Sequence, residues 1–359
     1  MTSEQASGAT ESAGREAIGA VDVTDGFVPV PIRTVTRETV DAVSLTLDLA
    51  SVAEGFDYRA GQFITVSVPI GAQWYRRCYS MSSAPSVDKG LRITVKRSIG
   101  GPVSNWINDN ARAGDVLNVR APEGRFVLDP LSDAPLVALA GGSGITPILS
   151  LIRTALHTTD RRLKLLYANR DRDSIIFRDE LDDLAELFGD RLEVGHHLDV
   201  DSGLLTRDQI VSVLDGCAGA DFYICGPRKF MDVAEEAVID ADPRSVHLER
   251  FETAEIPPPE EVSSVATPTT EEVTIRLGRQ KVTVAYRRGS TLLQTARSAG
   301  LRAPSSCETG SCGTCMARLR IGSARMVNND VLDDDEVAEG WVLTCQSLPT
   351  SPTVHVSYE

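Results

Sequence analysis

The N-terminal third of the chain alternates apolar and polar residues in short runs, the pattern of half-buried β-strands. Turns rich in Gly, Pro and Asp separate the runs. The runs are VPVPIRTVTRET, AVSLTLDL, QFITVSVP, RRCYSMSS, LRITVKRS and DVLNVRAP. They predict an antiparallel barrel or sandwich over residues 26–129. Residues 1–25 are small and polar, and they predict a disordered tail.

After residue 129 the pattern changes to unbroken apolar strands that alternate with amphipathic helices. The first strand, PLVALA, is followed by the turn GGSGITP and the helical run ILSLIRTALH. Further strands are RLKLLYANR, RLEVGHHL and ADFYICG, with helices expected at 177–188, 209–214 and 229–239. This alternation indicates βαβ units, so residues 130–253 predict an α/β domain with a doubly wound parallel sheet.

The last third begins with a segment that has almost nothing to bury. Residues 254–270, AEIPPPEEVSSVATPTT, are typical of a semi-extended linker. Residues 271–359 then return to short elements: a hairpin in EVTIRLGRQKVTVAY, a helix in TLLQTARSAG that ends at Gly300, and strands in MARLRIG and TVHVSYE. With 359 residues, the chain is also longer than one hydrophobic core usually serves, so we expect several domains.

Charge and hydropathy narrow the class of protein. The formal net charge of −15 argues against a nucleic-acid or anionic-membrane surface, which needs clustered Lys and Arg. The chain has no apolar run of about 18 residues, and its first residues lack the basic-then-apolar layout of a secretory signal. We therefore expect a cytoplasmic protein, acting as a monomer, with no nucleic-acid or membrane partner.

Four of the seven cysteines form the spacing Cys307-x4-Cys312-x2-Cys315-x29-Cys345. This is the plant-type arrangement of ligands to a [2Fe–2S] cluster. The loop residues are small, which lets backbone N–H groups turn toward sulfur; they are Ser306, Gly310, Ser311, Gly313 and Thr314. A four-thiolate zinc site and four unrelated core cysteines are the alternatives. Zinc sites usually present two paired knuckles, whereas here the fourth cysteine stands alone.

The run Arg77-Cys78-Tyr79-Ser80-Met81-Ser82-Ser83 resembles the R-x-Y-S-x-x-S flavin motif of the ferredoxin-NADP reductase superfamily. Arg77 can pair with a flavin phosphate, Tyr79 offers a flat ring to the isoalloxazine, and the Ser80 hydroxyl can hydrogen-bond near flavin N5. The same alternation of polar and aromatic residues also suits any half-buried strand.

A second glycine-containing segment, GGPVSNW, follows a strand and is expected to open a helix. Its position matches the second flavin-phosphate segment of the same superfamily. Backbone N–H groups from Val103, Ser104 and Asn105, together with the Ser104 hydroxyl, could bind a pyrophosphate there, because helix N-termini favour anions.

The turn Gly141-Gly142-Ser143-Gly144-Ile145-Thr146-Pro147 departs from the G-x-G-x-x-G fingerprint, but it follows a buried strand, and Pro147 stands just inside the next helix. The resemblance implies that this turn receives a nicotinamide dinucleotide, through Gly142, Gly144, Thr146 and Pro147. A tight strand-to-helix turn without a ligand is the alternative.

Cys225-Gly226-Pro227 ends the apolar strand ADFYI, at the edge where ligands bind in open α/β sheets. The resemblance implies that Cys225 lies beside the nicotinamide C4, whereas a buried structural cysteine is the alternative. Glu249 and Phe251 fall where the superfamily has a residue that covers the second face of the flavin. Core packing at the end of a domain is the alternative for them.

The resemblance extends over residues 26–359, through RRCYSMSS, VKR..GG.VSNW, YANRD..SIIF, ICGP and ND.L...E...G..L.CQS. These motifs are most similar to the reductase components of bacterial 3-ketosteroid 9α-hydroxylases, with the phenylacetyl-CoA epoxidase reductases close to them. The resemblance implies a Greek-key β-barrel that binds the flavin, an α/β domain that binds the nicotinamide cofactor, and a β-grasp ferredoxin domain. The phthalate dioxygenase reductases, which use FMN, differ in domain order and in the placement of the serines, which favours FAD here.

The resemblance therefore implies an electron relay from NAD(P)H through FAD and the [2Fe–2S] cluster to a Rieske-type oxygenase or related hydroxylase component. Ser80 and Cys225 would act as catalytic residues at the flavin. After the second strand of the α/β domain, Arg170 and Arg172 alternate with Asp171 and Asp173, and the resemblance favours NADH over NADPH. A flavin-level reductase of a small acceptor with a regulatory cluster, and a non-enzymatic redox sensor, are the alternatives.

Overall fold

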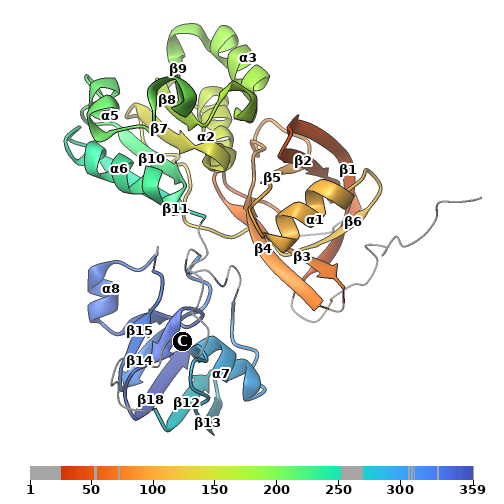
Figure 1. Cartoon of the computed structure of the whole chain (residues 1–359), viewed down its shortest axis with the longest axis vertical. Coiled ribbons are helices and arrows are strands. Elements are labelled where there is room, and N and C mark those ends of the chain that lie inside the picture. The colour runs from red at the N-terminus through yellow and green to blue at the C-terminus, as the bar shows by residue number, and fades with distance from the viewer. Residues whose placement is uncertain are drawn as a thin grey trace, which may run out of the picture.

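The computed structural model describes residues 26–51, 55–71, 73–251, 270–305, 308, 310, 312–329 and 331–358. The expected tail, 1–25, and nearly all of the expected linker, 254–270, lie outside these residues. The described elements form three large sheets, one from each third of the chain, and a small two-stranded sheet in the last third. Figure 1 shows each large sheet with its own helices.

Six antiparallel strands form the N-terminal barrel: β1 (Val28–Thr39), β2 (Ala42–Leu47), β3 (Phe63–Ile70), β4 (Gln73–Ser80), β5 (Leu91–Lys96) and β6 (Val116–Val119). Their order is β4-β3-β6-β1-β2-β5, so β6 inserts between β1 and β3. A bridge between Met81 and Ile93 joins the two outer strands and closes the barrel. The alternating apolar residues fill its interior, and η2 (Leu49–Ser51) and α1 (Pro102–Asn110) lie in the connections. The expected Greek-key barrel is confirmed.

The middle sheet is parallel, with strands β7 (Leu136–Gly141), β8 (Leu163–Asn169), β9 (Leu192–Leu198), β10 (Asp221–Gly226) and β11 (Ser245–Arg250). Its helices are α2 (Ile145–Thr158), α3 (Arg178–Phe188), α4 (Asp199–Ser202), α5 (Arg207–Val213) and α6 (Arg228–Ile239), with short turns η3 (Gly142–Gly144), η4 (Arg172–Ser174) and η5 (Gly189–Arg191). The order β11-β10-β7-β8-β9 reverses direction beside β7, and separate apolar clusters cover the two faces. The doubly wound sheet is confirmed, with its switch point between β7 and β10.

Three helix starts differ from the sequence expectation, and one of them is that of α6, which begins one residue early, at Arg228. Helix α3 begins at Arg178 because Phe177 adopts φ 61°, a left-handed conformation that a helix cannot contain. Helix α5 begins at Arg207, because the Thr206 hydroxyl accepts from the Gln209 backbone N–H while the Gln209 side chain accepts from the Thr206 N–H. This capping box was readable in the sequence as Thr-x-x-Gln.

The C-terminal sheet has strands β12 (Glu272–Leu277), β13 (Gln280–Ala285), β14 (Met316–Ile321), β16 (Trp341–Leu343) and β18 (Thr353–Tyr358), in the order β13-β12-β18-β14-β16. Strands β15 (Ala324–Met326) and β17 (Ser347–Pro349) form a small second sheet, and α8 (Asp334–Ala338) precedes β16. Helix α7 (Leu292–Ser298) packs Leu292, Leu293 and Ala296 against the sheet residues Val273 and Ile275. One helix laid across a mixed sheet is the expected β-grasp fold.

The β-barrel and the α/β domain are joined by partly buried ion pairs. The Arg153 guanidinium on α2 makes two contacts with the Asp88 carboxylate, at 2.6 and 2.8 Å. Arg92 on β5 likewise pairs with both carboxylate oxygens of Glu180 on α3, at 2.9 and 3.1 Å. Because each pair joins two planar groups through two parallel contacts, these pairs set the orientation of the two domains as well as holding them together.

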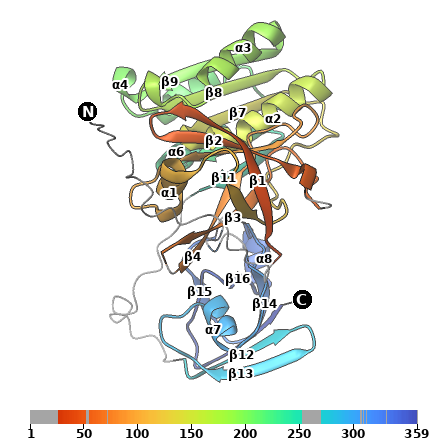
Figure 2. The ribbon, with the colours of Figure 1, turned by 90° about the vertical axis from the view of Figure 1, so that its right-hand side faces the viewer.

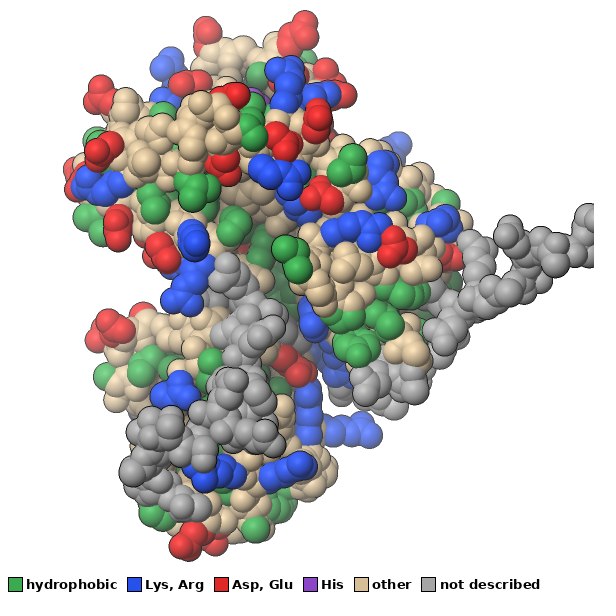
Figure 3. Space-filling model, in the orientation of Figure 1, with side chains coloured by type: hydrophobic (Ala, Val, Ile, Leu, Met, Phe, Trp, Pro, Cys, Tyr) green, Lys and Arg blue, Asp and Glu red, His purple; other side chains and the backbone are tan. Residues whose placement is uncertain are grey.

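The C-terminal domain lies beside the ends of β3 and β4 (Figure 2). The space-filling view is hollowed where the three domains meet, and over its visible face acidic and basic side chains are interspersed (Figure 3). Among the described residues, no helix is both long enough and apolar enough to span a membrane.

Candidate functional site

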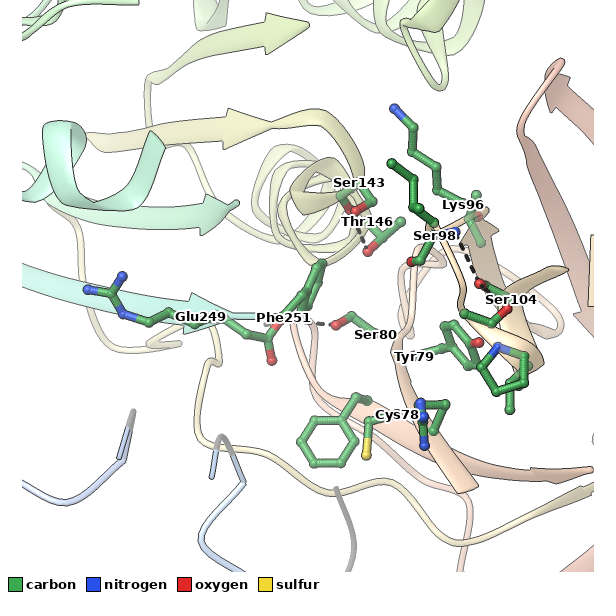
Figure 4. A pocket seen from close by; sticks show the side chains of 18 of the residues that line it. Cys78, Tyr79, Ser80, Lys96, Ser98, Ser104, Ser143, Thr146, Glu249 and Phe251 are labelled. Atoms are coloured by element: carbon green, nitrogen blue, oxygen red, sulfur yellow. Dashed lines mark hydrogen bonds between the residues drawn. The ribbon is translucent and has the colours of Figure 1, made fainter. Parts of the chain in front are cut away.

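A cavity of about 340 Å³ opens where the three domains meet, and we call it the central cavity. Its walls come from β4, from β5 and the start of α1, from the turn after β7, from the end of β11 and from the cysteine loop of the C-terminal domain (Figure 4). It is bordered by Phe63, Arg77, Cys78, Tyr79, Ser80, Thr94, Lys96, Ser98, Ile99, Gly100, Gly101, Pro102, Val103, Ser104, Ser143, Thr146, Glu249, Arg250, Phe251 and Cys312.

Strand β4 supplies four consecutive cavity residues, from Arg77 to Ser80. The Arg77 guanidinium donates to the Arg76 carbonyl at 2.7 Å, which holds its cationic end at the cavity wall. The Tyr79 ring borders the cavity, and burial raises the pKa of its hydroxyl, so the ring is neutral. Cys78 lies 3.4 Å from the Thr65 hydroxyl on β3. The strand therefore presents a cation, a flat neutral ring and a hydroxyl to one space.

The start of α1 borders the central cavity through Pro102, Val103 and Ser104. No side chain caps this helix at Gly101, so the N–H groups of its first turn are left to a ligand or water. The Ser104 hydroxyl instead accepts from the Ser98 N–H at 3.1 Å and donates to the Gly101 carbonyl at 3.3 Å. The Asn105 amide donates to the Ser98 carbonyl at 3.1 Å. These two side chains shape the loop, and the positive end of the helix dipole suits an anion.

The hydroxyl of Ser80 donates to the Glu249 carboxylate at 3.0 Å, across the boundary between the barrel and the α/β domain. Burial raises the pKa of Glu249 to about 8, although the Ser80 hydrogen bond lowers it. The parallel register of β10 and β11 aligns Glu249 with Cys225. Cys225 is fully buried, and desolvation raises the pKa of its thiol, so it is uncharged. Residues far apart in the sequence thus meet beside the cavity.

The glycine turn after β7 packs against the end of β10. A Cβ atom on Gly144 would lie 2.1 Å from the Cys225 carbonyl oxygen, and one on Gly226 would lie 2.6 Å from the Phe230 ring. The Tyr167 hydroxyl donates to the Gly142 carbonyl at 2.9 Å, which anchors the turn. Only glycine allows these close approaches, so the turn is built to bring the start of α2 to the end of β10.

Within this turn, Ser143 and Thr146 border the central cavity, and the Thr146 hydroxyl donates to the Ser143 carbonyl at 3.1 Å. Other expected nucleotide residues are described but do not border the cavity; they are Gly142, Gly144, Pro147, Cys225, Gly226 and Pro227. Asn105 does not border it either. Phe251, which is 40 % exposed, stands at the cavity in the same region as Glu249.

Three of the four motif cysteines are described, while Cys307, with Ser306 and Ser311, lies outside the described residues. Cys315 and Cys345 are buried, and their loops are tied together because Thr344 donates to the Cys315 carbonyl through its N–H at 3.2 Å and its hydroxyl at 2.9 Å. Cys312 is partly exposed and borders the central cavity. Its sulfur lies 3.2 Å from the Thr314 hydroxyl oxygen.

The cysteine loop fits a cluster that the backbone must follow closely. Gly310 has φ +92°, and a Cβ atom there would lie 2.9 Å from the Asn328 carbonyl oxygen. Gly313 has φ +76°. Both conformations turn N–H groups in directions that L-residues rarely allow. Among the described residues, which do not include Cys307, no group of three or more His, Cys, Asp or Glu side chains could hold a metal ion.

Several cavity residues were missed by the sequence reasoning. Thr94 and Lys96 share one face of β5, and the strand alternation could have indicated them. Ser143 stands inside the glycine turn that was singled out. By contrast, no local sequence pattern indicates Phe63 or Arg250 as cavity residues, because their approach to the cavity depends on the packing of the domains.

Three family models match successive parts of the chain. Residues 29–128 match the oxidoreductase FAD-binding domain, residues 138–236 the oxidoreductase NAD-binding domain, and residues 275–350 the 2Fe-2S iron-sulfur cluster binding domain. The matched order agrees with the order of the barrel, the parallel sheet and the β-grasp sheet.

Full-length relatives are also found. The chain is 38 % identical to the ferredoxin reductase component of 3-ketosteroid-9-alpha-monooxygenase from Mycobacterium tuberculosis, covering 96 % of this chain and 99 % of the relative. It is 32 % identical to one component of the 1,2-phenylacetyl-CoA epoxidase from Escherichia coli, covering 93 % of this chain and 98 % of that component.

Among solved structures, phthalate dioxygenase reductase superposes with a TM-score of 0.65 at 29 % identity, over 93 % of this chain and 98 % of that one. This full-length match argues against the difference in domain order that we expected from the sequence. The preference for FAD does not depend on that argument, because the barrel matches a FAD-binding model.

Proposed function

The chain belongs to the oxygenase reductase components that combine FAD-, NAD- and [2Fe–2S]-binding domains, and on this premise we propose how its residues carry electrons from NADH to an oxygenase partner. One observation carries the proposal: the central cavity is bordered at once by Ser80 of the barrel, Thr146 of the α/β domain and Cys312 of the ferredoxin domain. A flavin held there would lie within reach of both its electron donor and its acceptor.

FAD would be held in the central cavity by Arg77 and the first turn of α1 at its phosphates, and by Tyr79 along its ring. When bound, it supplies the change from two-electron to one-electron chemistry that the relay needs. The uncapped N–H groups at Val103 and Ser104 complement the negative charge of a pyrophosphate. Asn105 supports the loop through its amide rather than facing the cavity.

Ser80 and Glu249 would control the polar edge of the flavin. With its pKa raised to about 8, Glu249 is mostly protonated at pH 7 and does not oppose negative charge that develops nearby. Its contact with the Ser80 hydroxyl holds that group at the cavity wall. We therefore propose that Ser80 positions the reacting end of the flavin and that Glu249 keeps the site neutral.

The nicotinamide dinucleotide would lie along the turn from Gly142 to Pro147 and reach the Cys225-Gly226-Pro227 edge. Cys225 contributes shape and not charge, because its buried thiol stays protonated. Phe251 is exposed enough to move aside when the nicotinamide approaches the flavin. These residues would bring the hydride donor and acceptor together and exclude water from the step.

We also propose a preference for NADH. The Arg170 guanidinium is paired with the Asp171 carboxylate at 2.7 Å, and that carboxylate also accepts from the Ser174 N–H at 2.9 Å. Arg170 is therefore neutralised at the position where a 2′-phosphate would need a cation. A fixed carboxylate beside it would repel the phosphate.

Cys307, Cys312, Cys315 and Cys345 would hold the [2Fe–2S] cluster, and a Rieske-type oxygenase or related hydroxylase component would take its electrons. The relatives support an oxygenase partner, since their names describe monooxygenase and epoxidase components. A monomer in the cytoplasm is part of the same proposal; light scattering after gel filtration and cell fractionation test these two points.

The test is anaerobic reduction of the purified protein by NADH. We expect the flavin absorption to bleach within seconds and a rhombic [2Fe–2S] EPR signal to develop. Cys345→Ser should keep the flavin step and lose electron delivery to a protein acceptor. Delivery that survives this change would favour a flavin-level reductase, and an absence of bleaching in the wild type would favour a redox sensor.

A further inference from the structure

Two hydrogen bonds between described residues join the ferredoxin domain to the β-barrel at the rim of the central cavity. The Thr314 hydroxyl donates to the Glu123 carboxylate at 2.8 Å, and the Arg120 guanidinium donates to the Ser305 carbonyl. Both barrel residues follow β6. Ser305 precedes the cysteine loop and Thr314 stands within it. Figure 2 shows the ferredoxin domain beside β3 and β4 of the barrel.

The barrel side of this contact is rigid. Glu123 exchanges two backbone hydrogen bonds with Phe63 on β3, each 2.9 Å long, and the Arg120 N–H donates to the Thr65 carbonyl at 2.9 Å. Phe63 is buried and borders the central cavity. Glu123 is therefore held by its backbone against Phe63, a residue of the cavity wall, so its carboxylate has a fixed position relative to that wall.

The ferredoxin side of the contact leads to a cluster ligand. Thr314 stands between Cys312 and Cys315, and its hydroxyl oxygen lies 3.2 Å from the Cys312 sulfur. In the loaded protein this sulfur is a thiolate, which can only accept a hydrogen bond, so it and the Glu123 carboxylate compete for the single hydroxyl proton of Thr314. The Glu123 oxygen is the nearer of the two acceptors, at 2.8 Å against 3.2 Å. Cys312 is also the described motif cysteine that borders the central cavity. An unbroken path of contacts thus runs from the cavity wall to Cys312.

We propose that Glu123 and Thr314 are positioning residues that dock the cysteine loop against the flavin cavity, so that electrons enter the cluster on the Cys312 side. The inference rests on the proposed function and adds to it the contact that controls the flavin-to-cluster step. In that step one electron crosses from reduced FAD to the cluster, where one ferric ion becomes ferrous, and no bond forms or breaks. Loss of the contact between Thr314 and Glu123 would increase the distance between the flavin and the cluster over which the electron is transferred.

The experiment compares Thr314→Val and Glu123→Ala with wild type by anaerobic stopped-flow absorption with NADH. Flavin reduction should be unchanged, because Ser80 and the nucleotide turn are untouched. Cluster reduction should slow by about tenfold, as expected for the loss of one hydrogen bond to a charged group. The double variant should be no slower than either single variant, because each removes the same contact.

Two matched variants serve as controls. Thr314→Ser keeps the hydroxyl and should retain the wild-type rate. Thr350→Val removes a hydroxyl that bonds to Ser323 at 2.9 Å inside the ferredoxin domain and should also leave the rate unchanged. If Thr314→Val fails to assemble a cluster, seen in its absorption spectrum, Glu123→Ala decides the matter, since it lies outside the cysteine loop.

Two further measurements distinguish a loss of docking between the domains from a change in the reduction potential of the cluster. Hydrogen–deuterium exchange of the oxidised holoprotein should increase in peptides covering 116–126 and 312–321 in both variants. The cluster reduction potential should stay within error of wild type. An unchanged rate or exchange pattern would overturn the inference, as would a potential shift that accounts for the slower step. If the wild-type cluster itself is not reduced by NADH, it is the proposed function that fails.

Discussion

Ser80 and Glu249, which stand 169 positions apart in the sequence, meet in a 3.0 Å hydrogen bond that spans two domains. The contact places a carboxyl with a raised pKa at the wall of the central cavity. Two opposing effects set the pKa of Glu249: burial favours the neutral acid, while the hydrogen bond from the Ser80 hydroxyl favours the anion. We therefore expect this pair to make the flavin step sensitive to pH in a range where ordinary carboxyls are fully ionised.

The rate of flavin reduction by NADH should change near pH 8 in the wild type. Below that pH Glu249 is protonated; above it a buried anion opposes electron transfer into the flavin, so the rate should fall. Glu249→Gln should remove this transition, whereas Ser80→Ala should move it to higher pH because the anion loses its donor. Stopped-flow traces across pH 6–9 measure both shifts, with the pH range chosen to bracket the pKa of about 8. Identical profiles in wild type and Glu249→Gln would refute the assignment.

Gly144→Ala should weaken both the stability of the α/β domain and its affinity for NADH. The added Cβ would lie 2.1 Å from the Cys225 carbonyl, so the turn or the end of β10 must shift. Overpacking of this kind costs about 1–3 kcal/mol. Gly195→Ala is the matched control, since its Cβ would meet the Leu165 carbonyl at 3.7 Å, an ordinary contact. Thermal unfolding and NADH titration of both variants check the prediction, which fails if the two behave alike.

Asp171→Ser should lower the preference for NADH over NADPH by about tenfold, because it frees the Arg170 guanidinium and removes a fixed negative charge. Serine can still accept from the Ser174 N–H, so the local turn should persist. The quantity to measure is the ratio of kcat/KM for the two cofactors. Asp179→Ser, which breaks the comparable pair with Arg178 on the exposed start of α3, should leave that ratio unchanged. A ratio unaltered by Asp171→Ser would count against this site.

Arg153→Leu should destabilise the junction of the barrel and the α/β domain. It removes two contacts to Asp88 and one to Glu180, and it leaves the Asp88 carboxylate with the hydrogen bond from the Ala84 N–H but without its cation. Because the pair is partly screened by solvent, the cost should be about 1–3 kcal/mol, below that of a fully buried pair. Arg178→Leu, whose partner Asp179 is 89 % exposed, should change the melting temperature little. Equal melting temperatures for the two variants would show that the Arg153 pair does not hold the domains.

The local patterns of the sequence were sufficient for the architecture. The alternating runs became the six barrel strands, the apolar strands became the parallel sheet, and the expected β-grasp elements formed around α7. Period and turn chemistry act over a few residues, so they can be read without the fold. The one-residue difference at Phe177 shows the limit, since tertiary packing holds that side chain buried in a left-handed conformation.

The cysteine spacing likewise determined which cluster to expect, because ligand identity and spacing are properties of the sequence itself. The flavin was expected from the family resemblance that the Arg77-x-Tyr79-Ser80 run carries. Which residues share the central cavity was decided by the tertiary structure. Phe63, Glu249 and Cys312 come from three different domains. Their meeting depends on how rigid domains pack, through contacts such as Thr314 to Glu123, and no local pattern encodes a distance between domains.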